Sequence, residues 1–491
     1  MTSDRDQSSD AVAPLVEAWR RARAAERRPM QIPGHKMRYL QGAHGWADDL
    51  VGDTVRDDIP LQGGVDDNAY SNGYLAQAEV LWARAIGADF SRFLVGGSTQ
   101  GNIAALGTIA DQDVPIAIDR TSHRSTQAGL VLIGARPVWI YPRLHPEFHL
   151  PIGVEASSLE AVSEPVNAFF ATSPSYIGTL SDVAALAAVT QRRRAPLMID
   201  QAWGAHLDFL PGRGAISQGA ISQGAISQGA DFAVTSVHKT LLGYSQTAVV
   251  SMRENMIPRS TLDRWVDLTT TTSPSGTLLA TIDGSRAAME RGGVNRLGLI
   301  IEAVADARRR LARVRGLVVL DDTTAGCSVD PTKLTLILPG TGADGAALGQ
   351  ELWRLGHGPE SADQDTLVLT LTVADEPEWI VEFADLLAAL IEENRGQRRP
   401  PSLLSVWRVE PEVVLTPREA FLRGRRRVGA RDAIGEVSAE QFCPYPPGVP
   451  LLAPGERVTE EALTAIRAAS AYCRIAYCSD PSLETILIVD Q

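Results

Sequence analysis

The sequence predicts an α/β domain built around a mainly parallel sheet, and two observations support this fold class. Apolar segments of strand length alternate with helical segments from Arg92 to Asp200, which is typical of a parallel sheet with crossover helices. Short polar motifs follow several of these strands, and ligands of open α/β sheets bind at the carboxyl ends of the strands. We therefore expect a ligand site at that edge of the sheet.

Composition and charge limit the possible partners. The chain has 491 residues, 44% of them hydrophobic, and a formal net charge of −13. This length is enough for two or three domains, and the acidic charge argues against nucleic acid or an anionic membrane as the main partner. Met1 to Asp10 lack the apolar core of a signal peptide, and no apolar run is long enough for a membrane span. We expect a cytoplasmic protein.

The four cysteines predict neither a disulfide framework nor a metal site, because their number and spacing match no pattern of either kind. They are Cys327, Cys443, Cys473 and Cys478. We expect reduced thiols and no bound metal.

The N-terminal part, residues 1–70, is expected to form a helix and an irregular arm. Residues 11–27 carry apolar side chains at helical spacing. The turn Pro33-Gly34-His35-Lys36 follows, and then a Gly- and Asp-rich segment with little periodicity that ends at about Asn72. An amphipathic helix over Tyr74–Ile86 comes next.

The large domain, predicted over residues 71–310, contains the alternating elements. The expected strands are Ser91–Val95, Val114–Asp119, Arg136–Tyr141, Ala168–Thr172 and Pro196–Asp200. The expected helices between them are Gly101–Ile109, Ser125–Ile133, Leu159–Val162 and Asp182–Arg193. A further apolar strand begins at Asp231 and leads into the turn that contains Lys239.

Residues 215–229 repeat the sequence Ala-Ile-Ser-Gln-Gly three times, just before this last strand. Three units of five residues are too short for a solenoid, so we interpret two copies as an insertion that lengthens a helix or a surface loop. Such an insertion costs little closure entropy.

A long amphipathic helix over Val294–Val314 is expected to lead into a C-terminal α+β region, residues 311–491. The strands expected there are Leu334–Leu338, Thr366–Leu371, Ser405–Glu410 and Thr485–Val489. The expected helices are Ala346–Leu355, Trp379–Asn394 and Glu460–Tyr472.

Three polar motifs at strand ends could bind a ligand, and each has a simpler alternative. The segment Gly96 to Asn102 opens a helix and could cradle an anion with its free backbone amides, or it could be a plain N-cap. His123 could stack on an aromatic cofactor, or be a partly exposed ring beside a capping serine. Asp200 ends a buried strand and could pair with a protonated pyridine nitrogen, or cap the next helix.

Lys239 belongs to a fourth motif. Burial at a strand end would lower the pKa of its amine and leave it able to attack an aldehyde; the alternative is a solvated lysine. The four motifs follow the order of a phosphate cradle, a ring stacker, a carboxylate for the ring nitrogen and a lysine, which argues against a chance arrangement. We predict that Lys239 holds pyridoxal 5'-phosphate (PLP) as a Schiff base.

With these motifs the chain resembles the Orn/Lys/Arg decarboxylases of PLP fold type I, in the short bacterial form. The resemblance implies a large domain with a seven-stranded, mainly parallel sheet and a smaller α+β C-terminal region. The motifs that carry it are Pro33-Gly34-His35-Lys36-Met37, Gly97-Ser98-Thr99-Gln100-Gly101-Asn102, Ser122-His123-Arg124-Ser125, Ser236-Val237-His238-Lys239-Thr240, Thr271-Thr272-Ser273-Pro274-Ser275, Asp330-Pro331-Thr332-Lys333-Leu334 and Tyr445-Pro446-Pro447-Gly448-Val449-Pro450.

The resemblance also implies roles for individual residues. Lys239 would form the Schiff base, Asp200 would bind the pyridine nitrogen, and His123 and Ala202 would lie on the two faces of the ring. Residues expected at or beside the phosphate are Ser98, Thr99, Gln100, Ser236 and His238. Lys239 or a nearby histidine would protonate Cα, so the candidate catalytic residues are Lys239, His123, Asp200 and His238.

The family forms homodimers with active sites at the subunit interface, so Thr272 and Ser273 are expected to reach the cofactor of the partner subunit. Three residues depart from the family pattern. Gln201 and Trp203 stand in the segment that usually reads Asp-Glu-Ala-His-Gly, and Gly276 replaces an aromatic residue. These changes affect the substrate side of the site more than the cofactor side.

The expected activity is PLP-dependent decarboxylation of arginine, lysine or ornithine. The alternative is a repurposed enzyme of the same scaffold that acts on a modified amino acid in secondary metabolism, by elimination, cyclisation, transamination or oxidation. Gln201 and Gly276 motivate this alternative, because they suggest a widened pocket. A third possibility is a regulatory subunit without activity, against which the retention of Lys239, Asp200 and His123 argues.

Overall fold

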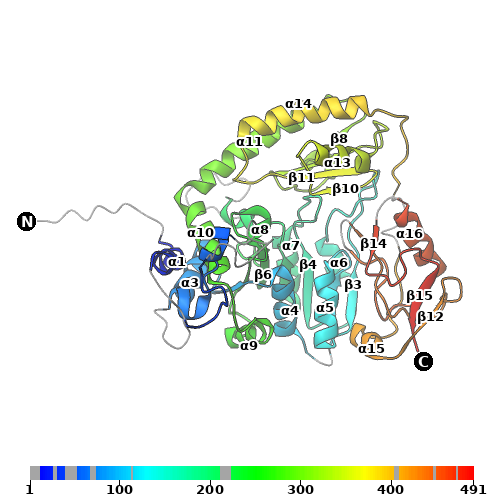
Figure 1. The fold of residues 1–491 in the computed structure, drawn as a ribbon. Helices are drawn as coiled ribbons and strands as arrows, with labels where there is room; N and C mark the ends of the chain where they lie inside the picture. The colour runs from blue at the N-terminus through cyan, green and yellow to red at the C-terminus, as the bar shows by residue number, and fades with distance from the viewer. Residues whose placement is uncertain are drawn as a thin grey trace, which may run out of the picture.

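A computed structural model describes residues 12–25, 30–38, 52–66, 73–111, 114–210, 223–402, 409–445, 449–471 and 474–490. The described residues form a large α/β unit, a second unit around a four-stranded sheet, and a third unit at the C-terminal end (Figure 1). No helix among them combines the length and the apolar character needed to cross a membrane.

The large unit contains a seven-stranded sheet in the order β1-β7-β6-β5-β4-β2-β3. Its strands are β1 (Phe90–Leu94), β2 (Ile116–Asp119), β3 (Pro137–Ile140), β4 (Ala168–Thr172), β5 (Leu197–Asp200), β6 (Phe232–Ser236) and β7 (Ala248–Met252). Strand β7 is antiparallel to both of its neighbours, and the remaining strands share one direction. The predicted seven-stranded, mainly parallel sheet is confirmed.

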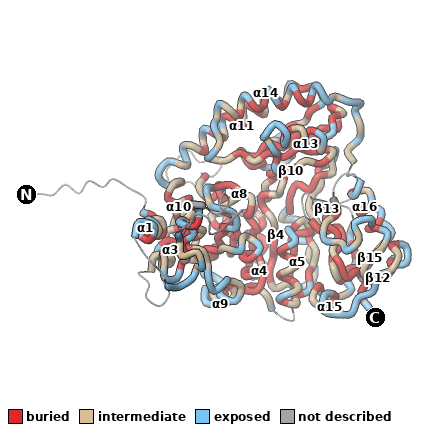
Figure 2. The backbone as a smooth tube through the Cα atoms, in the orientation of Figure 1, coloured by how far each residue is buried: buried red, intermediate tan, exposed pale blue. Residues whose placement is uncertain are grey.

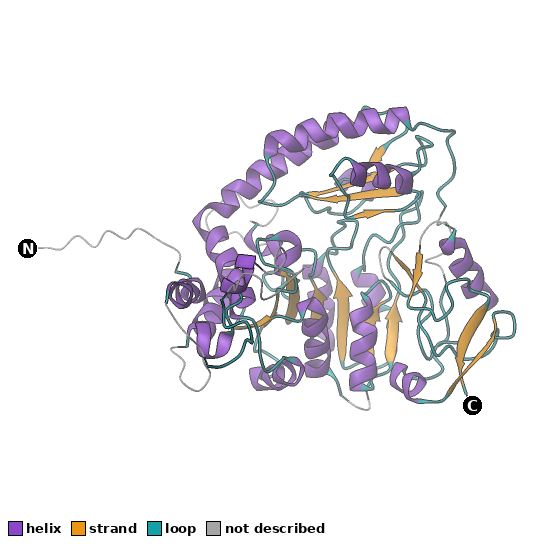
Figure 3. Cartoon of the chain, in the orientation of Figure 1, coloured by secondary structure: helices purple, strands orange, loops and turns teal. Residues whose placement is uncertain are grey.

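Both faces of this sheet are covered, which explains why its strands read as continuous apolar runs. Ile116 and Ile118 pack on one side, and Ala117 packs on the other. One face is covered by α4 (Gly97–Ile109), α5 (Arg124–Ile133) and α9 (Arg259–Thr269), and the other by α3 (Tyr74–Ile86), α6 (Ala156–Glu160) and α7 (Val183–Arg193). Figure 2 shows the buried sheet between its helical layers, and Figure 3 shows the same layers by element type.

The N-terminal segment packs on the large unit. Helix α1 (Pro14–Ala24) contacts α10 (Gly276–Ala288), where the Leu15 amide donates to Asp283 Oδ2 at 3.0 Å. Within the predicted irregular arm the structure describes residues 30–38 and 52–66, which include short helical turns at Gly52–Arg56 and Leu61–Val65.

The second unit places an antiparallel sheet, β10-β11-β9-β8, beneath two long helices (Figure 1). Helices α11 (Val294–Leu311) and α14 (Pro377–Glu393) supply the apolar core above the sheet, and α13 (Gly345–Arg354) lies beside it. The strands are β8 (Val318–Val319), β9 (Lys333–Ile337), β10 (Ser361–Ala362) and β11 (Thr366–Thr370), with the short helix α12 (Asp322–Ala325) after β8.

The third unit has its own small core, and a buried ion pair joins it to the large unit. Its elements are α15 (Pro417–Leu422), β12 (Arg425–Gly429), β13 (Cys443–Tyr445), α16 (Glu460–Ser470), β14 (Arg474–Ala476) and β15 (Thr485–Val489). Arg120, which follows β2, binds the Glu456 carboxylate at 2.5 Å and 3.0 Å, and it also donates to Leu451 O at 2.9 Å. Both charged side chains are nearly inaccessible.

Several expected elements differ in detail. The helix expected at Leu159–Val162 lies at Ala156–Glu160, and the helix expected from Gly101 begins at Gly97, inside the glycine-rich motif. The strand expected at Ser405–Glu410 lies mostly outside the described residues, and Val409 and Glu410 are not in a strand. Much of the pentapeptide repeat is also outside them, but its third copy, residues 225–229, is described and packs against the core through Ala225 and Ile226.

Candidate active site

The residues of all four motifs line one cavity of about 400 Å³ at the carboxyl edge of the large sheet. The cavity lies where β1, β2, β5 and β6 end, and β7, which runs in the opposite direction, begins at the same edge. Predicted site residues that line it are Ser98, Thr99, His123, Asp200, Ala202, Ser236, His238 and Lys239.

An anion cradle forms at the start of α4. Gly97 adopts a φ of +69°, which a residue with a side chain rarely adopts, and the helix begins there, so its first amides point out of the helix end. Ser98 Oγ and Ser236 Oγ lie 2.6 Å apart and join the cradle to the end of β6. His238 Nδ1 donates to Thr247 O at 2.8 Å, which places the proton on Nδ1 and leaves Nε2 as an acceptor.

Asp200 is the centre of a buried hydrogen-bond network. Its Oδ2 accepts from Asn102 Nδ2 at 2.7 Å, and its Oδ1 accepts from the Ala202 amide at 3.0 Å. Asn102 Nδ2 also donates to Ser125 Oγ at 2.9 Å, and this hydroxyl lies 3.0 Å from His123 Nδ1. The network therefore connects the carboxylate to the ring of His123 through two polar side chains.

His123 is the N-cap of α5, and its Nδ1 accepts from the Ser125 amide. Nδ1 is therefore an acceptor, so a neutral ring carries its proton on Nε2. The ring is accessible from the cavity, and desolvation by the surrounding protein lowers its pKa. A neutral imidazole at this place can lie flat against an aromatic ligand.

Lys239 also lines the cavity, with its Nζ 3.9 Å from the centroid of the Trp203 ring. Burial lowers the pKa of its amine, while the carboxylates of Asp200 and Glu360 act in the opposite direction. The unprotonated amine is the form that reacts with an aldehyde, and a lowered pKa increases the fraction of lysine in this form.

The donor set of the cavity fits PLP. A phosphate group suits the helix start with its hydroxyls, and a pyridinium nitrogen suits the buried carboxylate of Asp200. Thr172 Oγ1 also belongs to this cavity, and it is buried without a hydrogen-bond partner among the described residues. Such a hydroxyl is expected to find a partner in a bound ligand.

A second cavity of about 480 Å³ adjoins the first and shares His123, Tyr176, Trp203 and Lys239 with it. Its outer wall comes from the second unit and includes Glu360, which precedes β10. The sequence prediction did not identify Glu360, because no spacing links it to Lys239 and only the packing of the two units brings it close. The prediction also did not assign a role to Asn102, although this residue lies within the glycine-rich motif.

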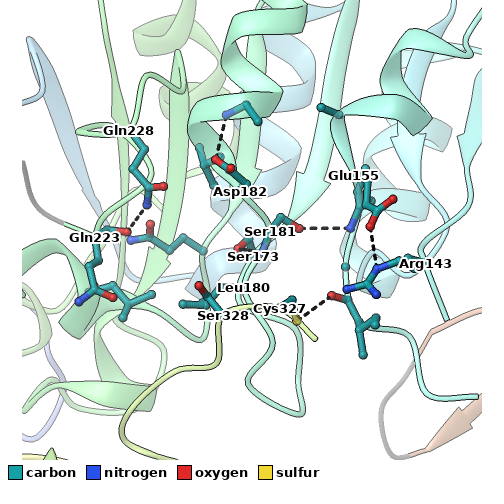
Figure 4. Close-up of a pocket in the computed structure, with 18 of the residues that line it drawn as sticks. Arg143, Glu155, Ser173, Leu180, Ser181, Asp182, Gln223, Gln228, Cys327 and Ser328 are labelled. Atoms are coloured by element: carbon teal, nitrogen blue, oxygen red, sulfur yellow. Dashed lines mark hydrogen bonds and ion pairs between the residues drawn. The ribbon is translucent and has the colours of Figure 1, made fainter. Parts of the chain in front are cut away.

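A third and larger cavity, of about 770 Å³, lies beside the site and is shown in Figure 4. Its polar groups are paired with each other: Arg143 binds Glu155 at 2.7 Å, and Ser181 Oγ accepts from the Val154 amide at 3.2 Å. Among the described residues that line it, we find no lysine, histidine or other arrangement that suits cofactor chemistry.

Three predicted site residues lie outside the first cavity. Gln100 is buried and bridges the Gly96 amide and Thr270 Oγ1. Thr272 and Ser273 are exposed on the surface of the chain.

Two of the departures from the family pattern also lie away from Lys239. Gln201 lines the third cavity instead, and it binds Gly204 O, Asp208 and the Ala225 amide. Gly276 is covered by the N-terminal arm, where an added Cβ would lie 2.9 Å from Pro60 O. Neither residue widens the two cavities of this chain, whereas Trp203 lines both.

The seven-stranded sheet and its helical layers define the fold of the type I PLP-dependent enzymes. The structure is similar to that of lysine decarboxylase A from Pseudomonas aeruginosa, with a TM-score of 0.79 at 19% identity, over 98% of this chain and 81% of that chain. It is also similar to the lysine decarboxylase LdcF of Francisella novicida, with a TM-score of 0.78 at 18% identity, over 98% and 82% of the two chains.

The chain belongs to the Orn/Lys/Arg decarboxylase family, whose members are amino acid decarboxylases. Residues 13–325 match the major domain of this family, and residues 402–476 match its C-terminal domain. An arginine decarboxylase of Halalkalibacterium halodurans is 29% identical over 90% of this chain and 91% of the relative. An arginine decarboxylase of Bacillus subtilis is 27% identical over 90% and 91% of the two chains.

Proposed function

We propose that this protein is a PLP-dependent decarboxylase of a basic amino acid, with arginine as the first candidate substrate. The observation that best supports this proposal is the arrangement of two adjoining cavities. Lys239, Asp200 and His123 line the first cavity, and Glu360 lines the second. Relatives that match about nine tenths of both chains are named arginine decarboxylases, which favours arginine over lysine and ornithine.

PLP, when bound, supplies an electron sink for the bond that breaks at Cα. Lys239 would hold its aldehyde carbon, and the start of α4 with Ser98, Thr99 and Ser236 would hold its phosphate. Asp200 would keep a proton on the pyridine nitrogen. His123 and Ala202 would lie against the ring.

Glu360 is proposed to bind the distal cation of the substrate. It is the acidic side chain of the second cavity, and its field acts on Lys239, the residue that the substrate amine must approach. A carboxylate binds a guanidinium by charge-assisted hydrogen bonds, and an ammonium group is the smaller alternative. The rigid edge of β10 would fix the distance between the distal cation and the reacting Cα.

Protonation of Cα is proposed for Lys239 or a nearby histidine. His238 presents Nε2 as an acceptor in the neutral ring, and it can donate only after it takes up a second proton. The lowered pKa of Lys239 suits an amine that both gives and takes a proton during the reaction.

The active form is proposed to be a homodimer in which Thr272 and Ser273 reach the cofactor of the partner subunit. Their exposure on the single chain supports this proposal. Sedimentation of the wild type, together with loss of activity in a Thr272→Ala variant that retains the dimer, would test it.

The main test is to measure CO2 release from arginine, lysine and ornithine with purified protein supplied with PLP. We expect release from arginine, and none after Lys239→Ala, which also removes the visible absorbance of the bound cofactor. Release of CO2 from none of the three would contradict this function. A repurposed activity then becomes the better hypothesis, although the positions of Gln201 and Gly276 no longer support a widened pocket.

A further inference from the structure

The chain has three lysines among its 46 basic residues, namely Lys36, Lys239 and Lys333. Two of them, Lys239 and Lys333, contact the same side chain. Their Nζ atoms lie 3.9 Å and 4.0 Å from the centroid of the Trp203 ring. The two nitrogens are therefore no more than about 8 Å apart, a distance at which charges interact strongly inside a protein.

The surroundings of Lys333 form a defined site. This residue begins β9 and is 1% exposed, and its Nζ donates to Thr370 Oγ1 at 2.7 Å. Its aliphatic part lies against Gly178, where an added Cβ would be 2.7 Å from Lys333 Cγ. Among the described residues, no carboxylate oxygen lies within 4.0 Å of its Nζ.

The carboxylates near Lys333 are engaged elsewhere or more distant. Asp330 binds His206 at 3.0 Å and the Thr332 side chain at 2.8 Å. Glu360 acts on Lys239 and Lys333 alike, and both carboxylates favour the protonated form of Lys333. Burial outweighs them, the charge of Lys239 acts in the same direction as burial, and the pKa of Lys333 falls to about 8, so this lysine still carries its charge at neutral pH.

We propose that Lys333 is a positioning residue that acts across Trp203, where its positive charge keeps the Lys239 amine unprotonated and free to react. A second cation near an amine disfavours protonation of that amine. Asp200 and Glu360 favour the protonated form of Lys239, and the charge of Lys239 in turn lowers the pKa of His123. The charge of Lys239 lowers the pKa of Lys333. Because coupling between two sites is reciprocal, the charge of Lys333 acts in the same way on Lys239 and opposes these two carboxylates.

The choice of lysine over arginine fits this role. Arginine fills almost every other basic position of the chain, and its guanidinium cannot lose its proton in a protein. Lys333 can lose its proton when Lys239 gains one, so the two amines can share one charge. An arginine would hold a fixed charge instead.

The test follows the three lysines by NMR in the full-length protein labelled with ¹³C at lysine Cε, prepared without PLP. Each lysine gives one signal, and single substitutions assign them. Lys36 is in the N-terminal arm and lines neither cavity, so it serves as the internal reference. We expect the titration midpoint of Lys239 to rise by about one pH unit in Lys333→Met, which is a roughly tenfold loss of free amine below the midpoint.

Coupling between two sites is reciprocal, so Lys239→Met must raise the midpoint of Lys333 by the same amount. This second variant keeps the test valid where Lys333→Met fails to fold. Lys333→Arg retains the charge and is expected to keep the Lys239 midpoint at or below its wild-type position. An unchanged Lys239 midpoint in folded Lys333→Met overturns the proposal, because a purely structural role would not shift a titration.

The inference rests on the proposed function only in taking Lys239 as the lysine that binds the cofactor. The titration needs neither PLP nor a substrate, so failure to release CO2 and failure of the coupling are separate results. A second readout is the rate at which the protein without cofactor captures added PLP, followed by visible absorbance. In Lys333→Met this rate is expected to fall about tenfold near pH 7 and to match the wild type at high pH.

Discussion

Asn102 donates a 2.7 Å hydrogen bond to Asp200, and this bond joins α4 to the end of β5 at the cavity that Lys239 lines. Without it, the buried carboxylate would retain the Ala202 amide as its hydrogen-bond donor among the described residues. Asn102 therefore orients the group that we assign to the pyridine nitrogen.

An Asn102→Ala variant should bind PLP more weakly by about tenfold or more, because a hydrogen bond to a charged group contributes about 1.5–3 kcal/mol. The dissociation constant can be measured by titrating the visible absorbance of the cofactor. Thr108→Val is the matched control, since Thr108 is buried on the same helix and its hydroxyl donates to Ala104 O, its one side-chain partner among the described residues. Equal affinity of Asn102→Ala and the wild type would remove Asn102 from the site.

A Glu360→Gln variant should show a KM for arginine that is about 10- to 100-fold higher, with a smaller change in kcat, since the lost contact binds a part of the substrate remote from the reacting bond. Steady-state kinetics measures both constants. The control is Glu351→Gln. Glu351 lies on nearby α13 and pairs with Arg354, but it does not line the second cavity, so this variant removes a negative charge without changing the proposed binding site. A kcat loss with unchanged KM would argue against binding of the distal cation by Glu360.

Breaking the Arg120–Glu456 pair should destabilise the protein by about 3–5 kcal/mol, because it leaves one buried charge without a partner. Denaturant unfolding of Glu456→Gln measures this loss. The double variant Arg120→Met/Glu456→Met should be less destabilised than the sum of the single changes. Arg192→Met, which removes an exposed pair with Glu160, should cost about 1 kcal/mol or less.

We predict that Asp208 makes the free energy of unfolding depend on pH. Burial raises its pKa from 3.8 to about 7, so the folded chain keeps a proton that the unfolded chain loses. The contribution of this residue to the free energy of unfolding is therefore complete below about pH 4 and is lost as the pH rises to about 7. Between these values the free energy of unfolding falls by at most about 1.4 kcal/mol per pH unit. Asp208→Asn should remove this slope between pH 5 and 7 in urea unfolding, and an identical slope in both proteins would contradict the assignment.

The large sheet was predictable because its strands are short apolar runs between helical segments, and each polar motif follows a strand. Strand β7 was not assigned from the alternation, since an antiparallel strand needs no crossover helix and leaves no such signal. The helix at Leu159–Val162 was displaced because a one-turn helix has too few residues for a clear period.

The presence of Asp200, His123 and Lys239 in one cavity was predictable for a similar reason: Asp200 ends a strand of the large sheet, and the other two residues follow strands of the same sheet. The position of Glu360 was not predictable from the sequence, because this residue belongs to the second unit, which packs over the edge of the large sheet. The role suggested for Gly276 as a widening of the pocket also failed, since the 59–65 segment of the same chain fills the space beside it. The surroundings of Gly276 and Glu360 depend on packing between segments that are distant in the sequence, and the residues next to them in the sequence do not indicate this packing.

The ion pair between Arg120 and Glu456 has a consequence for how the gene can change. It spans the two family domains, and Arg120 stands three residues before His123, so the C-terminal partner supports the loop that presents this ring. A chimera that joined this major domain to a C-terminal domain lacking the acidic residue would bury an unmatched guanidinium beside the active site. An exchange of the C-terminal domain is therefore expected to need an acidic residue at the position of Glu456.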